Sequence, residues 1–234
     1  MISLDTLQQR MQKIEQEIQA ACDRSGRNRQ DVTVVAVTKQ VSEDRAREVI
    51  EIGVSNLGEN RPEGLLAKQE NIQSDDVCWH FIGNVQSRKV RDIINQVDFL
   101  HSLDRLSIAK EIQKRAASSV DCFVQVNVSG EESKSGLTPS ELEGFILQLA
   151  DYDKIRVVGL MTMAPFTQDE EWIRKIFRSL RSLRDQIAAE NLDYAPCTLL
   201  SMGMSNDYSI AIEEGATHVR IGTALVGTES EGDE

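Results

Sequence analysis

The sequence has no long apolar run and no excess of positive charge. Nowhere in its 234 residues is an apolar segment long enough to span a bilayer, and residues 1–19 lack the basic and then apolar regions of a secretory leader. The formal net charge is −12, whereas proteins that bind nucleic acid or anionic membranes carry basic patches. We therefore expect a cytoplasmic protein that binds neither nucleic acid nor membrane and whose partners are small molecules.

Paired cysteines are missing as well. The chain has four cysteines, which are far apart and form no C-x-x-C motif: Cys22, Cys78, Cys122 and Cys197. This spacing indicates neither a zinc site nor a disulfide framework, so we expect buried thiols. The three histidines also lack metal-ligand spacing, and we interpret them as hydrogen-bonded structural groups: His80, His101 and His218.

The chain also lacks a G-x-G-x-x-G turn and a Pro/Gly/Ser-rich linker, which favours one domain without a dinucleotide fingerprint. Instead, strand-like and helix-like segments alternate along the chain. Eight β-rich runs are separated by segments of helical period: 32–39, 54–59, 79–83, 99–104, 122–128, 156–163, 198–203 and 218–223. Strict alternation predicts a parallel sheet, and eight units predict a closed (β/α)8 TIM barrel, with an open doubly wound sheet as the alternative.

Helical periodicity is clearest over 169–189. An extra N-terminal helix precedes the first strand, and its apolar stripe predicts that it covers the bottom or side of the sheet: Leu7, Met11, Ile14 and Ile18. We expect residues 1–228 to form the barrel domain and residues 229–234, "ESEGDE", to form an acidic tail.

Lys39 ends the first strand, at the edge of a barrel where the following loops build active sites. A lysine at a strand end is more often simply solvated. Beside the apolar run "VVAV", however, partial desolvation of the amine would favour the neutral form, which attacks a carbonyl to make a Schiff base.

A phosphate site is predicted at the last two strands. Gly222 and Thr223 follow the eighth strand, where a glycine lets backbone N–H groups approach an anion and the threonine supplies a hydroxyl. Ser201 comes from the seventh strand, and this region of TIM barrels often binds phosphate. The alternative is a tight turn in which glycine serves packing. A ligand with both a phosphate and a carbonyl would fit this site and Lys39.

Seven ordered motifs covering nearly the whole chain resemble one family: "AVTK" (36–39), "GEN" (58–60), "WHFIGNVQSRK" (79–89), "HSLD" (101–104), "VNVSGEESKSG" (126–136), "GLMTMAP" (159–165) and "LSMGMSNDYSIAIEEGATHVRIGTALVG" (200–227). The sequence is similar to the pyridoxal phosphate homeostasis proteins, which are alanine racemase N-terminal-domain-like proteins. The sequence departs from the family in the stretch "NRPEGLLAK", which begins at Asn60 and where many relatives read more like N-x-x-Q-E. The resemblance therefore does not establish that Glu63 takes the role of the residues that these relatives have there.

The resemblance implies the cofactor pyridoxal 5′-phosphate (PLP). It makes Lys39 the residue that forms the Schiff base with PLP, and it makes Arg220 the residue facing the pyridine nitrogen. The other implied cofactor-binding residues are Ser201, Gly222 and Thr223 at the phosphate and Asn60 and Met161 around the ring. No metal site is implied.

The implied function is a PLP carrier or buffer in vitamin B6 and amino-acid homeostasis, without efficient turnover. A cationic partner disfavours protonation of the pyridine nitrogen and so weakens the ring as an electron sink. The tyrosine base of barrel-type alanine racemases comes from an additional domain, and the chain ends soon after its eighth strand. A weak PLP-dependent racemase and a PLP-free Schiff-base aldolase stay open as alternatives. We expect a monomer that passes PLP to PLP-dependent apoenzymes.

Overall fold

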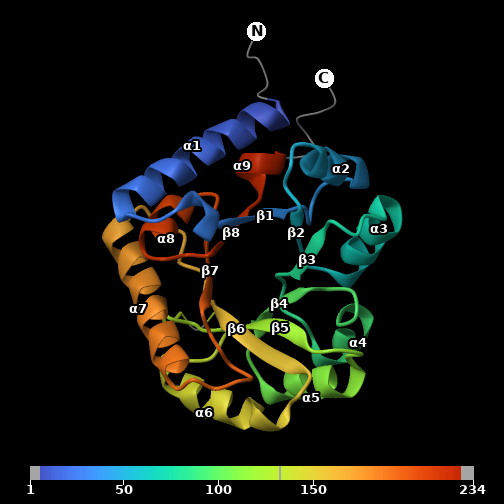
Figure 1. The fold of residues 1–234 in the computed structure, drawn as a ribbon, viewed down its shortest axis with the longest axis vertical. Helices are drawn as coiled ribbons and strands as arrows, with labels where there is room; N and C mark the ends of the chain where they lie inside the picture. The colour runs from blue at the N-terminus through green and yellow to red at the C-terminus, as the bar shows by residue number, and fades with distance from the viewer. Residues whose placement is uncertain (1–5, 132, 228–234) are drawn as a thin grey trace.

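A computed structural model describes residues 6–131 and 133–227, and these residues form a closed ring of eight parallel strands. The strands pair in chain order, and β8 returns to β1, so the predicted (β/α)8 barrel is confirmed (Figure 1). Their bounds are β1 Thr33–Val37, β2 Asn56–Glu59, β3 Cys78–Phe81, β4 Phe99–Leu103, β5 Val120–Gln125, β6 Ile155–Met161, β7 Leu199–Met204 and β8 His218–Ile221.

The helices surround the ring of strands (Figure 1). They are α1 Leu7–Ser25, α2 Glu43–Glu51, α3 Pro62–Ile72, α4 Val90–Ile93, α5 Leu106–Arg115, α6 Leu142–Gln148, α7 Glu170–Ala189, α8 Tyr208–Glu213 and α9 Thr223–Val226. Short 3-10 turns occupy Arg29–Asp31, Ser87–Lys89, Pro139–Glu141 and Leu149–Asp151. In the described part of the chain no helix is long and apolar enough to cross a membrane.

The predicted N-terminal helix is α1. Thr6 and Gln9 form a capping box at its start, and Gly26 ends it in the left-handed conformation with φ 67°. The buried stripe of α1 includes Ile14 and Ile18, and the helix packs against α8 and α9. It therefore covers the side of the barrel next to the last strands, which was one of the two predicted positions.

The ends of the strands differ from the predicted ends by at most three residues. β1 stops at Val37, and Thr38 and Lys39 follow it in a turn in which the Val41 N–H donates to the Thr38 carbonyl (3.2 Å). Periodicity cannot locate this boundary, because a buried strand continues into a buried Thr38 with no change of polarity pattern until Lys39.

The barrel has two apolar layers. A large core fills the space between strands and helices, and a smaller cluster inside the ring consists of Phe123, Val158 and Met161. Three cysteines are buried as predicted, but Cys78 is only half-buried, because it begins β3 at the barrel base. The tail predicted at 229–234 lies outside the described residues.

Candidate functional site at the carboxyl end of the barrel

Three predicted site residues follow neighbouring strands at the same edge of the ring. Val37 of β1 pairs with Gly58 of β2, and Ala36 pairs with Ile221 of β8. Lys39, Asn60 and Gly222 come one or two residues after these strands. The closed register therefore brings together residues from the first and last parts of the chain.

Lys39 is exposed. The prediction that the apolar strand would partly desolvate its amine is wrong, because the strand ends two residues earlier and the buried position belongs to Thr38. The Lys39 side chain is therefore accessible to a ligand that enters from solvent.

Arg220 of β8 is a buried cation in the barrel interior, with only 5% of its surface exposed. Its Nη1 donates to the Ser201 hydroxyl (2.5 Å), and its Nη2 donates to the Thr162 carbonyl (3.0 Å). Both acceptors are neutral. Burial lowers the pKa of Arg220 to about 10, against a raising effect of Asp207, so the guanidinium stays charged at neutral pH.

Ser201 is fully buried on β7, and its hydroxyl faces the interior rather than the mouth. Besides accepting from Arg220, it lies 2.8 Å from Nδ1 of His101 on β4. The structure therefore brings Ser201 together with Arg220, not with the loop that contains Gly222 and Thr223.

A different serine lies beside that loop. The backbone N–H of Gly222 donates to the hydroxyl of Ser205, at 3.2 Å. Ser205 is half-buried and Thr223 is exposed, so this group of donors is reachable from the mouth. Ser205 follows β7 and is preceded by Met204, whose N–H donates to the Asp207 carboxylate (2.5 Å). This bond fixes the turn that presents Ser205.

Ser205 was missed from the sequence because the motif "SMGMS" holds two serines four residues apart. If β7 kept a regular pleat, both would point the same way, because side chains alternate along a strand. Gly203 has φ 94°, however, and the register between β7 and β8 shifts between Ser201 and Met204. The left-handed conformation of Gly203 changes the direction of the chain, so the hydroxyls of Ser201 and Ser205 point in different directions.

Asn60 and Met161 lie at the edge of the site. Asn60 is half-buried after β2, and its backbone sits so close to Gly83 that a Cβ there would meet the Asn60 carbonyl oxygen at 2.3 Å. Met161 is buried at the end of β6, next to Ser201 in the β6–β7 register.

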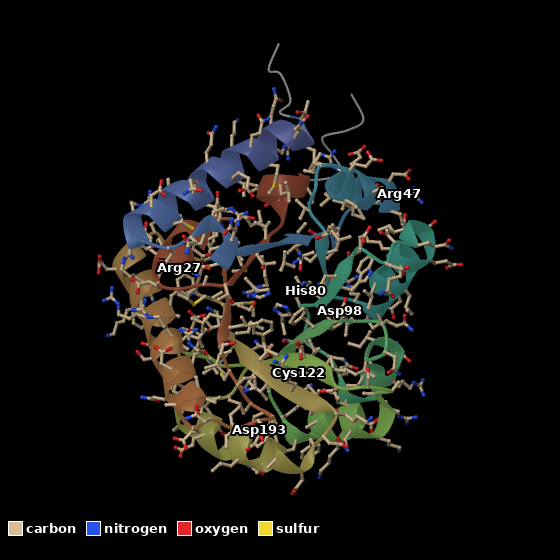
Figure 2. All side chains as sticks on the ribbon, viewed as in Figure 1. Arg27, Arg47, His80, Asp98, Cys122 and Asp193 are labelled. Atoms are coloured by element: carbon tan, nitrogen blue, oxygen red, sulfur yellow. The ribbon has the colours of Figure 1, made fainter. Side chains whose placement is uncertain are left out.

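The three histidines lie inside the barrel, and Figure 2 shows His80 near the middle of the ring of strands. Each is hydrogen bonded to a neighbouring side chain, as predicted. Burial lowers the pKa of His80 to about 3 and that of His218 to about 4, and it also lowers the pKa of His101. All three imidazoles are therefore neutral. Across residues 6–131 and 133–227, no cluster of three or more His, Cys, Asp or Glu side chains could hold a metal.

A buried ion pair supports the first two strands from outside the ring. Glu59 of β2 accepts a hydrogen bond from Thr38 (2.6 Å) and pairs with Lys68 of α3 (3.2 Å). Lys68 and Glu59 are only 4% and 1% exposed. This pair fixes the strand ends next to Lys39, and no spacing rule in the sequence pointed to it. Glu63 does not join it and lies exposed, 3.4 Å from Lys89.

Comparison with known proteins identifies the family to which this barrel is similar. The family model described as "Alanine racemase, N-terminal domain" matches residues 2–230. A pyridoxal phosphate homeostasis protein of Aquifex aeolicus is 41% identical over 222 residues, covering 94% of this chain and 96% of that protein. A solved structure of an unknown protein from Bifidobacterium adolescentis has 34% identity and a TM-score of 0.89, with 94% of each chain covered.

PipY of Synechococcus elongatus PCC7942, solved with PLP bound, is 28% identical and has a TM-score of 0.81; the match covers 95% of this chain and 100% of PipY. The family model and the Aquifex aeolicus relative both match nearly the full length. The chain thus belongs to the alanine racemase N-terminal domain family and, within it, to the pyridoxal phosphate homeostasis proteins.

Proposed function

We propose that this protein binds PLP at the carboxyl end of the barrel, holds it as a Schiff base on Lys39, and acts as a carrier or buffer in PLP homeostasis. The proposal is carried by an accessible amine directly after β1 and, on the neighbouring strand β8, a buried guanidinium followed by the donor group of Gly222 and Ser205. PLP bound to PipY, a relative of the same fold, supports it.

The available groups fit the chemical parts of PLP. Its aldehyde condenses with a primary amine and releases water, and water or another amine reverses the reaction. Lys39 supplies that amine. The hydroxyls of Ser205 and Thr223 can donate to a phosphate, as can the Gly222 N–H, which donates to Ser205 in this structure.

We assign the phosphate hydroxyl of the seventh strand to Ser205 rather than to Ser201. The Ser201 hydroxyl is fully buried and already contacts Arg220 and His101, so it acts through Arg220. In this proposal Asn60 and Met161 border the ring.

Arg220 disfavours transamination and similar chemistry and leaves racemase-like proton transfer or simple binding. A cation facing the pyridine nitrogen keeps that nitrogen unprotonated, which weakens the ring as an acceptor of electrons. The three tyrosines do not offer a second base, because Tyr152 and Tyr194 lie before β6 and β7, at the opposite end of the barrel, and the Tyr208 hydroxyl donates to Glu17 of α1. We therefore propose slow or absent turnover of amino acids.

The remaining parts of the proposal concern the whole protein. We propose that residues 1–228 act as one PLP-binding unit with 229–234 as a tail. We also propose that the protein is a cytoplasmic monomer and that PLP-dependent apoenzymes accept its cofactor.

The test is a PLP titration followed by absorbance, then borohydride reduction and peptide mapping. We expect a near-visible band, with the pyridoxyl group on Lys39. The band should be lost in Lys39→Ala and kept in Lys89→Ala and Lys134→Ala, two matched controls on loops near the mouth. An unchanged band in Lys39→Ala would contradict the proposal. Rapid racemisation of alanine by the purified protein would contradict the carrier role.

A further inference from the structure

The barrel interior contains a continuous chain of polar side chains, of which the proposed function uses only the end at Arg220 and Ser201. It starts at Arg220, whose Nη1 is 2.5 Å from Ser201 Oγ, and continues from that oxygen to His101 Nδ1 at 2.8 Å. His101 Nε2 lies 2.9 Å from His80 Nδ1, and His80 Nε2 lies 2.9 Å from Asn56 Oδ1. We call these five side chains the histidine relay. It crosses the ring from β8 to β7, β4, β3 and β2.

The direction of each hydrogen bond follows from chemistry. An arginine can only donate, so the Ser201 oxygen accepts from Arg220. At the other end the Asn56 oxygen can only accept, so His80 carries its proton on Nε2 and accepts at Nδ1. His101 must then donate from Nε2, which leaves its Nδ1 as the acceptor of the Ser201 proton.

The opposite direction fails at Ser201. If His101 donated from Nδ1, the Ser201 oxygen would accept from both His101 and Arg220, and its own proton would need a third partner. Ser201 is fully buried, and among the described side chains its hydroxyl forms hydrogen bonds only with His101 and Arg220. An unpaired buried hydroxyl proton is unfavourable, so the relay has one satisfied direction.

We propose that His101 and His80 are positioning residues: through a single-direction relay they aim the Ser201 lone pair at Arg220 and hold its guanidinium at the floor of the site. The functional part of this inference rests on the proposed binding of PLP, because the ring nitrogen would meet the arginine that the relay holds. The relay itself is a property of the chain without ligand.

The relay suits this task because every member is neutral except Arg220. A carboxylate in the place of Ser201 would attract the guanidinium and compensate its charge inside the barrel. A hydroxyl whose proton points away holds the guanidinium by geometry and leaves its positive charge available to a ligand. Cys78, whose sulfur lies 3.4 Å from His80 Nε2, is a neutral thiol, because burial raises its pKa to about 12.

The first test uses the protein without PLP. Long-range proton–nitrogen correlation spectra report which imidazole nitrogen carries the proton, and the chain has only 3 histidines to assign. We expect His80 and His101 both to be protonated on Nε2 alone at about pH 7, near the ordinary histidine pKa. Protonation of either on Nδ1, or on both nitrogens, would overturn the relay whether or not PLP binds.

The second test asks whether the relay holds Arg220. His101→Leu removes both hydrogen bonds, whereas His101→Gln keeps an acceptor and a donor on one amide. We expect the protected guanidinium N–H signal of Arg220 to be lost in the first variant and kept in the second, and PLP affinity to fall about tenfold only in the first. His218→Leu is the control, since His218 is also buried inside the barrel but forms its hydrogen bond with Thr217 instead.

The outcomes separate the two proposals. An Arg220 signal that survives in a folded His101→Leu protein would overturn the positioning role. Loss of that signal without any PLP binding by the wild type would support the relay and reject the proposed function. Circular dichroism of each variant identifies one that fails to fold, and for such a variant the His101→Gln spectrum decides.

Discussion

Among the individual residues, Ser201 on β7 and Ser205 directly after it show how two identical side chains acquire different tasks. Ser201 is fully buried against Arg220 and His101, whereas Ser205 is half-buried against the Gly222 N–H. Gly203 between them has φ 94°, and a Cβ on it would meet the Ala211 Cβ at 2.6 Å. The turn that separates the serines therefore needs a glycine.

A prediction for these residues compares PLP with pyridoxal, which lacks the phosphate. Ser205→Ala should weaken PLP binding about tenfold or more, because a hydrogen bond to a charged group contributes roughly 1.5–3 kcal/mol. It should leave pyridoxal binding unchanged. Ser201→Ala should weaken the binding of both PLP and pyridoxal, because Ser201 acts through Arg220 on the ring that both ligands share. Titrations followed by absorbance measure all four affinities. Equal losses of PLP and pyridoxal in Ser205→Ala would contradict the phosphate role.

At the scale of elements, the ion pair between Glu59 and Lys68 joins β2 to α3 in a region with almost no solvent access. Burying a charged side chain is unfavourable unless an opposite charge pairs with it. Here the Thr38 hydroxyl also donates a hydrogen bond to the Glu59 carboxylate. Thr38 directly precedes Lys39. The pair therefore links a helix to the turn that presents the proposed PLP-binding lysine.

Removing one partner should be costly. We expect Lys68→Ala to lower the free energy of unfolding by about 3–5 kcal/mol, because it leaves a buried carboxylate without its cation. Replacing both partners, as Glu59→Gln with Lys68→Met, should recover much of that loss. The control is Lys89→Ala, which breaks an exposed pair with Glu63 and should cost at most about 1 kcal/mol. Urea denaturation measures each value, and similar losses for Lys68→Ala and Lys89→Ala would contradict this account.

Elements were easier to predict from sequence than the contacts between them. Eight β-rich runs and their alternation with helices fixed the barrel, because period and order are local properties. The burial of Ser201 and the exposure of Lys39 depend on a left-handed glycine and on where β1 stops, which are set by register and packing. The Glu59–Lys68 pair joins residues whose types alone suggest a solvated surface.

At the scale of the whole molecule, the barrel encloses three neutral histidines, and this makes its stability depend on pH. Their pKa values are lowered in the folded state chiefly by burial, to about 3 for His80 and about 4 for His218, with that of His101 also well below normal. An unfolded chain binds these protons near the ordinary value of about 6.5. The unfolded state therefore gains protons first as the pH falls.

We therefore expect the stability that depends on these histidines to be fully present above about pH 6.5 and to be lost as the pH falls below it, by up to about 1.4 kcal/mol per pH unit for each histidine. Urea denaturation between about pH 7 and 5 measures this slope. Asp207 acts in the opposite direction, because burial raises its pKa. His101→Leu should reduce the slope by about one proton. A stability that is constant over this range would contradict neutral buried histidines.

The seam where β8 meets β1 also has a consequence for biosynthesis. Ala36 pairs with Ile221, and Arg27 donates to the carbonyls of Ile212 and Ala216, so the two strands that close the ring come from opposite ends of the described chain. Contacts so far apart in sequence form late, after the loops between them are ordered. On a ribosome, the lysine of the proposed site emerges long before its arginine. A nascent chain would thus contain the reactive amine of Lys39 before Arg220 and the Gly222 loop have been synthesised. Binding of the cofactor would therefore wait until β8 has been made and has paired with β1.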